Sequence, residues 1–129
     1  MNFSMTKPDL ISAVIDFSVQ TTPAEQSVVA EDRTMSANRI QTTTWNHYTD
    51  PTKQFFAGIW ASDVGAMIIS YTEEELCVIL EGKVKLTADD GSSIEFGPGS
   101  TFVIPAGFKG IWESLEPVKK IYTIWQAKN

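Results

Sequence analysis

The sequence is poor in the residues that most often build disulfides and metal sites, because it contains one cysteine, Cys77, and one histidine, His47. A single cysteine permits no disulfide within the chain, so the fold does not depend on an oxidising compartment. Long apolar runs are also missing. None approaches the roughly 18 residues of a membrane span, and residues 10–17 carry Asp16 and make a poor secretory signal. We therefore expect a cytoplasmic protein with no membrane contact.

Positive charge is scarce as well, with 10 basic residues against 16 acidic ones and a net charge of −6. Such a surface is not built to neutralise phosphate backbones or anionic lipid head groups, so nucleic acid is not expected as a partner. The 129 residues are 43% hydrophobic, which is enough to fill one compact core. We expect no second catalytic domain.

The first 36 residues show neither a sustained helical period nor long alternation, and they mix Ser, Thr, Asp, Glu and Pro with brief apolar pairs. We interpret residues 1–36 as an extended N-terminal arm and residues 37–129 as the folded barrel. In a small barrel, such an arm can lie across a neighbouring subunit and cover an exposed strand edge.

From about residue 37 the chain alternates between short stretches rich in β-branched and aromatic residues and turns rich in Gly, Pro and Asp. This pattern predicts an all-β fold, and no segment predicts a helix. The predicted strands are residues 39–45, 55–61, 66–71, 76–80, 83–87, 93–96, 101–104, 108–113 and 118–126.

The stretch 76–80, Leu-Cys-Val-Ile-Leu, is apolar on both faces of its predicted strand. One face would point into a barrel and the other toward a second buried layer, which suggests a homodimer. In residues 83–87, by contrast, valine and leucine alternate with lysines that face water.

Two groups of glycines stand at suggestive spacings. Glu75 and then Gly82 follow Gly65, and Pro105 and Gly107 follow Gly99. This arrangement resembles the two motifs of the cupin superfamily, in which glycines close the turns of a jelly-roll barrel. The resemblance covers residues 55–126 and is closest to the small single-domain branch related to ureidoglycine aminohydrolases and ethanolamine-utilisation cupins. The stretches that carry it are residues 71–75, 80–82, 105–108, 110–113 and 118–122. It implies a double-stranded β-helix, here with an extended N-terminal arm.

Metal-binding cupins carry two histidines and a glutamate in the first motif and a third histidine in the second. Aligned in this way, Glu75 keeps the glutamate position, whereas the histidine positions fall on Ile69, Tyr71 and Gly110. A divalent metal needs about three or four converging ligands, so we expect no tightly held metal and no cofactor. His47 lies before the motifs and is interpreted as a loop or strand-end histidine.

The resemblance places the motif residues inside the barrel, and strand alternation extends the set. The expected lumen residues are Ile69, Tyr71, Glu75, Cys77, Ile79, Gly110, Trp112 and Ser114. An apolar and aromatic lining with a few polar groups is typical of a small-molecule pocket. A glycine at position 110 would leave open space beside Trp112.

Glu75 and Tyr71 are the candidate catalytic residues. The carboxylate could act as general acid or base, or bind a cationic group, and the tyrosine could donate a hydrogen bond to the ligand or to Glu75. Alternatively, Glu75 is a carboxylate held by a lysine or a backbone amide, or one exposed member of the run 73–75. The alternative for Tyr71 is an aromatic residue that only fills the barrel.

Other positions are candidate ligand-binding residues. They are Trp60, Ile69, Gly110, Trp112, Lys120 and Tyr122. Lys119 and Lys120 are neighbours on a strand, so one of them could face the lumen and pair with Glu75 or an anionic substrate, although both could simply be solvated. The tryptophans, Trp125 included, could stack on a planar ligand or serve as core. Cys77 is interpreted as core, because its strand is apolar throughout.

Three functions follow from these residues. The first is a small-molecule-binding cupin that lacks the three-histidine site and holds its ligand in the lumen. The second is an enzyme of aminohydrolase or isomerase type that uses Glu75 as base and Tyr71 as acid on a small nitrogenous metabolite. The third is a structural or regulatory dimer whose barrel is simply core.

Overall fold

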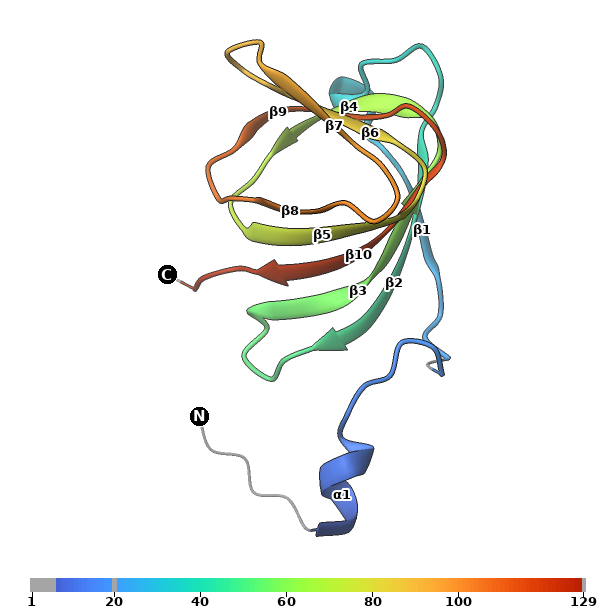
Figure 1. The fold of residues 1–129 in the computed structure, drawn as a ribbon, viewed down its shortest axis with the longest axis vertical. Coiled ribbons are helices and arrows are strands. Elements are labelled where there is room, and N and C mark those ends of the chain that lie inside the picture. The colour runs from blue at the N-terminus through green and yellow to red at the C-terminus, as the bar shows by residue number, and fades with distance from the viewer. Residues whose placement is uncertain (1–6, 20, 129) are drawn as a thin grey trace.

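Strands dominate the computed structural model, which describes residues 7–19 and 21–128 (Figure 1). The elements, in chain order, are α1 (Lys7–Ser12), β1 (Glu25–Val28), the 3-10 helix η1 (Glu31–Arg33), β2 (Gln41–Thr49), β3 (Phe55–Ser62), β4 (Gly65–Ser70), β5 (Glu74–Glu81), β6 (Val84–Ala88), β7 (Ser93–Phe96), β8 (Thr101–Ile104), β9 (Lys109–Ser114) and β10 (Val118–Trp125).

The strands form two antiparallel sheets that face each other. One sheet has the order β1-β2-β3-β10-β5-β8, and the other has the order β4-β9-β6-β7. From β4 onward the chain repeatedly crosses between the two sheets, so that β5, β8 and β10 alternate with strands of the smaller sheet. This winding closes a barrel (Figure 1), and the predicted all-β jelly roll is confirmed.

All nine predicted strands are present, and two of them, residues 93–96 and 101–104, have the predicted ends. The largest difference is β2, which runs from Gln41 to Thr49 where residues 39–45 were predicted. The extension continues past a β-bulge between Asn46 and Tyr48.

The expectation of no helix is wrong for α1, a six-residue helix that stands away from the barrel (Figure 1). Pro8 falls in its first turn, where the missing N–H costs no hydrogen bond. No helix in the described part of the chain has the length and apolar character needed to cross a bilayer.

The N-terminal residues before β2 tie the two sheets together. Strand β1, which was not predicted, is exposed along its whole length and pairs with the edge of β2. Further on, the Met35 N–H donates to the Ala66 carbonyl over 2.8 Å, and Thr34 bridges Met67 of β4. The segment from β1 to Met35 therefore spans from the edge of the large sheet to the edge of the small one.

His47 anchors the part of the chain that precedes β1. It lies in the bulge of β2, where its Nδ1 is 2.8 Å from the Thr22 hydroxyl and its ring packs against Phe17, with centroids 4.6 Å apart. The histidine holds the arm against the barrel and does not face the lumen residues.

Strand β5 is apolar on both faces, as predicted, but its two faces differ in exposure. Cys77 and Ile79 are buried inside the barrel, whereas Leu76 and Leu80 are each 39% exposed on the outer face. The paired position on β8, Val103, is 58% exposed. That a second copy of the chain covers this face stays a prediction.

Gly82 explains why the first motif ends in glycine. Its φ of +85° lies in the left-handed region, and an added Cβ would overlap the Pro117 carbonyl oxygen. The turn from β5 into β6 therefore accepts no side chain at this position.

Candidate functional site

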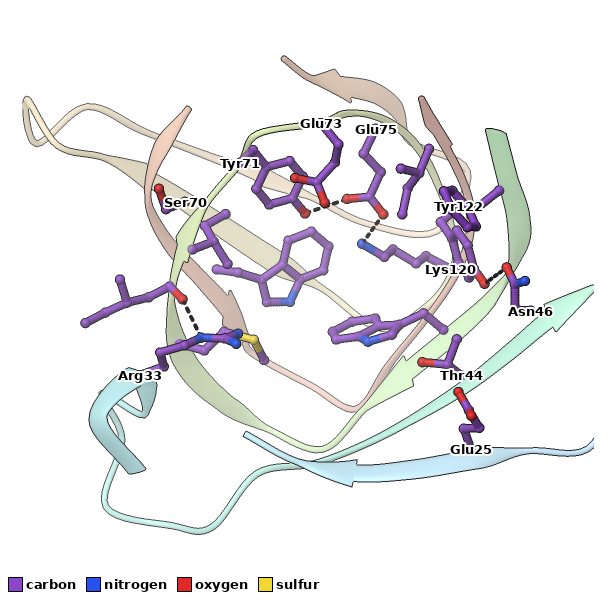
Figure 2. Close-up of a pocket in the computed structure, with 17 residues that line it drawn as sticks. Glu25, Arg33, Thr44, Asn46, Ser70, Tyr71, Glu73, Glu75, Lys120 and Tyr122 are labelled. Atoms are coloured by element: carbon purple, nitrogen blue, oxygen red, sulfur yellow. Dashed lines mark hydrogen bonds and ion pairs between the residues drawn. The ribbon is translucent and has the colours of Figure 1, made fainter. Parts of the chain in front are cut away.

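An open pocket of about 770 Å³ occupies the lumen (Figure 2). Seven of the eight predicted site residues line it, namely Trp60, Ile69, Tyr71, Glu75, Trp112, Lys120 and Tyr122. They come from both sheets, so the barrel architecture is what brings them together. The predicted lumen residues Cys77, Ile79 and Ser114 are buried but lie off the pocket wall.

Strand alternation places Lys120 inside the barrel. In β10, Val118, Lys120 and Tyr122 are buried in turn. Lys119 points outward instead, with 41% of its side chain exposed and its Nζ 4.0 Å from Glu81. The sequence left two alternatives open, one lysine in the lumen or both in solvent, and the structure has the first.

The Lys120 ammonium is fully engaged by protein groups. Its Nζ lies 2.9 Å from Glu75 Oε2 and 3.6 Å from Cys77 Sγ. It also stands over the rings of Trp60 and Trp112, 4.7 and 4.2 Å from their centroids. The two indoles meet edge to face, 5.5 Å apart at 86°, so they form two walls of a cage around the cation.

Burial is the largest single influence on the Lys120 ammonium and lowers its pKa, but the charges and hydrogen bonds of Glu75 and Cys77 together outweigh burial, so the net pKa is raised. The lysine is therefore a permanent cation at neutral pH. A protonated amine cannot attack a carbonyl, so Lys120 is not a candidate nucleophile.

Two tyrosines complete the polar part of the wall (Figure 2). The Tyr71 hydroxyl donates to Glu75 Oε1, and the Tyr122 hydroxyl donates to Asn46 Oδ1 over 2.7 Å. Burial and the nearby Glu75 charge raise both pKa values, that of Tyr122 to about 12. Both phenols therefore stay protonated.

Residues 49–122, which make up more than half of the chain, match the family described as the EutQ-like cupin domain. The chain belongs to this cupin family. The predicted membership of the cupin superfamily, and its likeness to ethanolamine-utilisation cupins, are thereby confirmed. The likeness to ureidoglycine aminohydrolases stays a prediction. No curated protein matches the cupin.

Solved structures share the fold. A Pseudomonas syringae pv. tomato protein of unknown function from the DUF861 family superposes with a TM-score of 0.73 at 23% identity, over 85% of this chain and 46% of its own. The Clostridium difficile EutQ protein gives 0.63 at 18% identity, over 79% and 75% of the two chains. A putative ethanolamine utilisation protein Q from Salmonella typhimurium gives 0.62 at 16% identity, over 84% and 100%. The cupin thus spans about half the length of the first of these relatives.

The residues at the motif positions do not fit a metal ion. Glu75 is the only carboxylate among them, and its two oxygens already accept from Lys120 and Tyr71. An ammonium 2.9 Å from that carboxylate repels a divalent cation. Across residues 7–19 and 21–128, no three His, Cys, Asp or Glu side chains gather in a way that could hold a metal. The lysine supplies the positive charge that neutralises Glu75.

The expectation that Gly110 leaves open space beside Trp112 is wrong. Gly110 is buried in β9 but does not line the pocket, and an added Cβ would overlap the Thr87 carbonyl oxygen of the neighbouring β6. The backbone of β6 takes up the space beside Gly110, so a histidine side chain would not fit there. Whether Gly110 contributes to binding in another way stays a prediction.

Several residues of the pocket wall were not predicted. Phe56, Met67 and Ile124 share a strand face with a candidate site residue two or four positions away, so strand alternation could have found them. Glu25 and Arg33 reach the pocket from β1 and η1, where nothing in the sequence indicated a wall. Trp125 is 46% exposed and belongs neither to the pocket nor to the core.

Cys77 is a buried free thiol, as predicted, and burial raises its pKa from 9.0 to about 12. Between these values the unfolded chain loses the thiol proton while the folded chain keeps it. The free energy of unfolding therefore falls with rising pH, by up to about 1.4 kcal/mol per pH unit from this group.

Cys77→Ser removes that titration, so we expect its stability to fall less steeply than that of the wild type between pH 9.5 and 11. Urea unfolding at four pH values measures both slopes. The tyrosines and Lys120 act in the same direction but are common to both proteins. Parallel slopes would contradict the assignment.

Proposed function

We propose that this cupin binds a small organic molecule in the barrel lumen, against the Lys120–Glu75 pair and without a metal ion. The observation that carries the proposal is an open pocket of about 770 Å³ at a buried ion pair. Small-molecule sites typically have roughly 300–1,000 Å³ and a mostly apolar lining with a few polar groups. A barrel that served only as core would be filled by side chains here, which counts against the purely structural dimer.

A thermal-shift screen against a broad metabolite library, ureides included, tests this proposal. A compound at about 100 times its Kd stabilises the folded state by about 2.7 kcal/mol, which raises the Tm by several degrees. Failure of every compound to raise the Tm would overturn the proposal.

Catalysis is the second candidate, favoured by the hydrogen bond between Tyr71 and Glu75 on the pocket wall. In this reading Glu75 takes a proton from the substrate and Tyr71 returns one. The resemblance to ureidoglycine aminohydrolases suggests a small nitrogenous metabolite as substrate. The raised pKa of Tyr71 works against proton donation, and Glu75 is engaged by Lys120, so catalysis ranks below binding.

Glu75→Gln separates the two candidates. Turnover of a compound found in the screen, followed by NMR, would be abolished in this variant if Glu75 is the catalytic base. If the protein only binds, no turnover is expected in the wild type either.

A further inference from the structure

We propose that the ligand of this pocket is an organic amine in its ammonium form, carried on a mostly apolar body, and that carboxylates and phosphates are excluded. This rests on the proposed binding function of the lumen. It follows from the charges, the hydrogen-bonding groups and the apolar surface of the pocket wall.

The charged groups on the wall leave an excess of anions for a ligand. Three carboxylates line the pocket, those of Glu25, Glu73 and Glu75, against two cations, Arg33 and Lys120. Lys120 is 4% exposed and already held by Glu75 and two indoles. An incoming anion would have to displace a carboxylate that lies 2.9 Å away.

The remaining cation lies at the rim. Arg33 is an exposed residue of η1 whose Nε donates to the Ile68 carbonyl over 3.4 Å. A solvated guanidinium contributes little to holding an anion, and Glu25 of the exposed strand β1 is discounted for the same reason. The less exposed part of the wall then keeps two carboxylates, Glu73 and Glu75, against Lys120 alone. Glu73, in contrast, is half-buried and lies beside Tyr71 and Glu75 (Figure 2).

The hydrogen-bonding groups point the same way. Tyr71 and Tyr122 donate their only hydroxyl protons to Glu75 and Asn46 respectively. Each phenol oxygen can therefore only accept a hydrogen bond from a ligand. Carboxylates are acceptors only. The polar groups gathered around Tyr71, Glu73 and Glu75 are therefore acceptors, which suits a ligand that donates hydrogen bonds, and an ammonium group supplies three donors.

The electrostatic potential agrees with this inventory. After burial, the charge of Glu75 is the largest cause that raises the pKa of both tyrosines, and Glu73 and Glu25 add to it at Tyr71 and Tyr122 respectively. Both phenol hydroxyls therefore lie where the electrostatic field of the carboxylates is negative. Most of the remaining wall is apolar, with Phe56, Met67 and Ile69 among its residues, and suits a hydrocarbon body.

Three probes of similar size but different charge test the proposal, namely 2-phenylethylammonium, 2-phenylethanol and phenylacetate, titrated at pH 7 and followed by NMR or calorimetry. We expect the ammonium compound to bind at least about tenfold more tightly than the other two. Equal or tighter binding of phenylacetate, or no binding of the ammonium compound, would overturn the proposal.

Matched charge variants then locate the contact. Glu73→Gln is expected to weaken binding of the ammonium compound about fivefold and to leave 2-phenylethanol unchanged. Glu74→Gln makes the same change in net charge on an exposed neighbour outside the pocket and should have no effect. Equal weakening by both variants would reflect overall charge only and would overturn the assignment.

These outcomes are distinct from failure of the binding function itself. If phenylacetate is selected and a bulky side chain at Thr44, on the pocket wall, abolishes its binding, the lumen is a binding site for anions. The proposed function would then stand while the ligand class would be wrong. A negative library screen would instead remove the binding function.

Discussion

Replacing Lys120 by methionine is expected to lower the free energy of unfolding by about 3–5 kcal/mol. Methionine keeps much of the side-chain volume but removes the ammonium that neutralises Glu75, which is 4% exposed. The carboxylate would then be buried without a cation. Urea unfolding of the wild type and the Lys120→Met variant at pH 7 measures the difference.

Two controls decide whether the buried charge is the cause. Lys119→Met removes the same charge from the exposed neighbour, whose partner Glu81 lies 4.0 Å away, and should cost less than about 1 kcal/mol. The double variant Glu75→Gln/Lys120→Met removes both charges and keeps an acceptor for Tyr71, so it should recover at least half of the loss. If the two single lysine variants lose the same amount, Lys120 does not have the role described above.

Thr44→Trp is expected to weaken ligand binding by at least about tenfold, equivalent to about 1.4 kcal/mol. Thr44 lies on the β2 wall of the pocket, opposite Trp60 in the pairing of β2 with β3. An indole at this position fills the space that the ligand needs. The affinity of a compound found by the library screen, measured by calorimetry, gives the effect.

The matched control is Thr43→Trp, which adds the same side chain one residue earlier. Because successive side chains of a strand point to opposite faces, this indole lies outside the pocket, and Thr43 is not among the pocket residues. Binding should be unchanged. Equal losses in the two variants would mean that the ligand does not occupy the lumen.

The barrel and most of its lining were predictable, because both depend on local patterns. Neighbouring side chains of a strand face opposite ways, so once one of the two lysines of β10 is assigned to the lumen, the other must face outward. The structure has Lys120 inward and Lys119 outward. The glycine and proline spacing of the two motifs fixes where Glu75 and Tyr71 lie on the barrel. These are properties of single strands and turns, which a sequence shows directly.

The parts that could not be predicted depend on contacts between distant segments. Strand β1 is exposed and held by backbone pairing with β2, so no pattern of buried and exposed side chains predicts it. Glu25 and Arg33 reach the pocket only through that pairing and through the bridge from Thr34 to Met67. At Gly110, the backbone of β6 fills the space that the missing side chain seemed to leave.

The most direct test is a crystal structure of the wild-type protein with a compound from the library screen. We expect the compound in the lumen against Tyr71 and Glu75, with the Lys120 ammonium still on the carboxylate. A compound bound outside the barrel, or a metal ion on Glu75 with Lys120 turned away, would contradict the account.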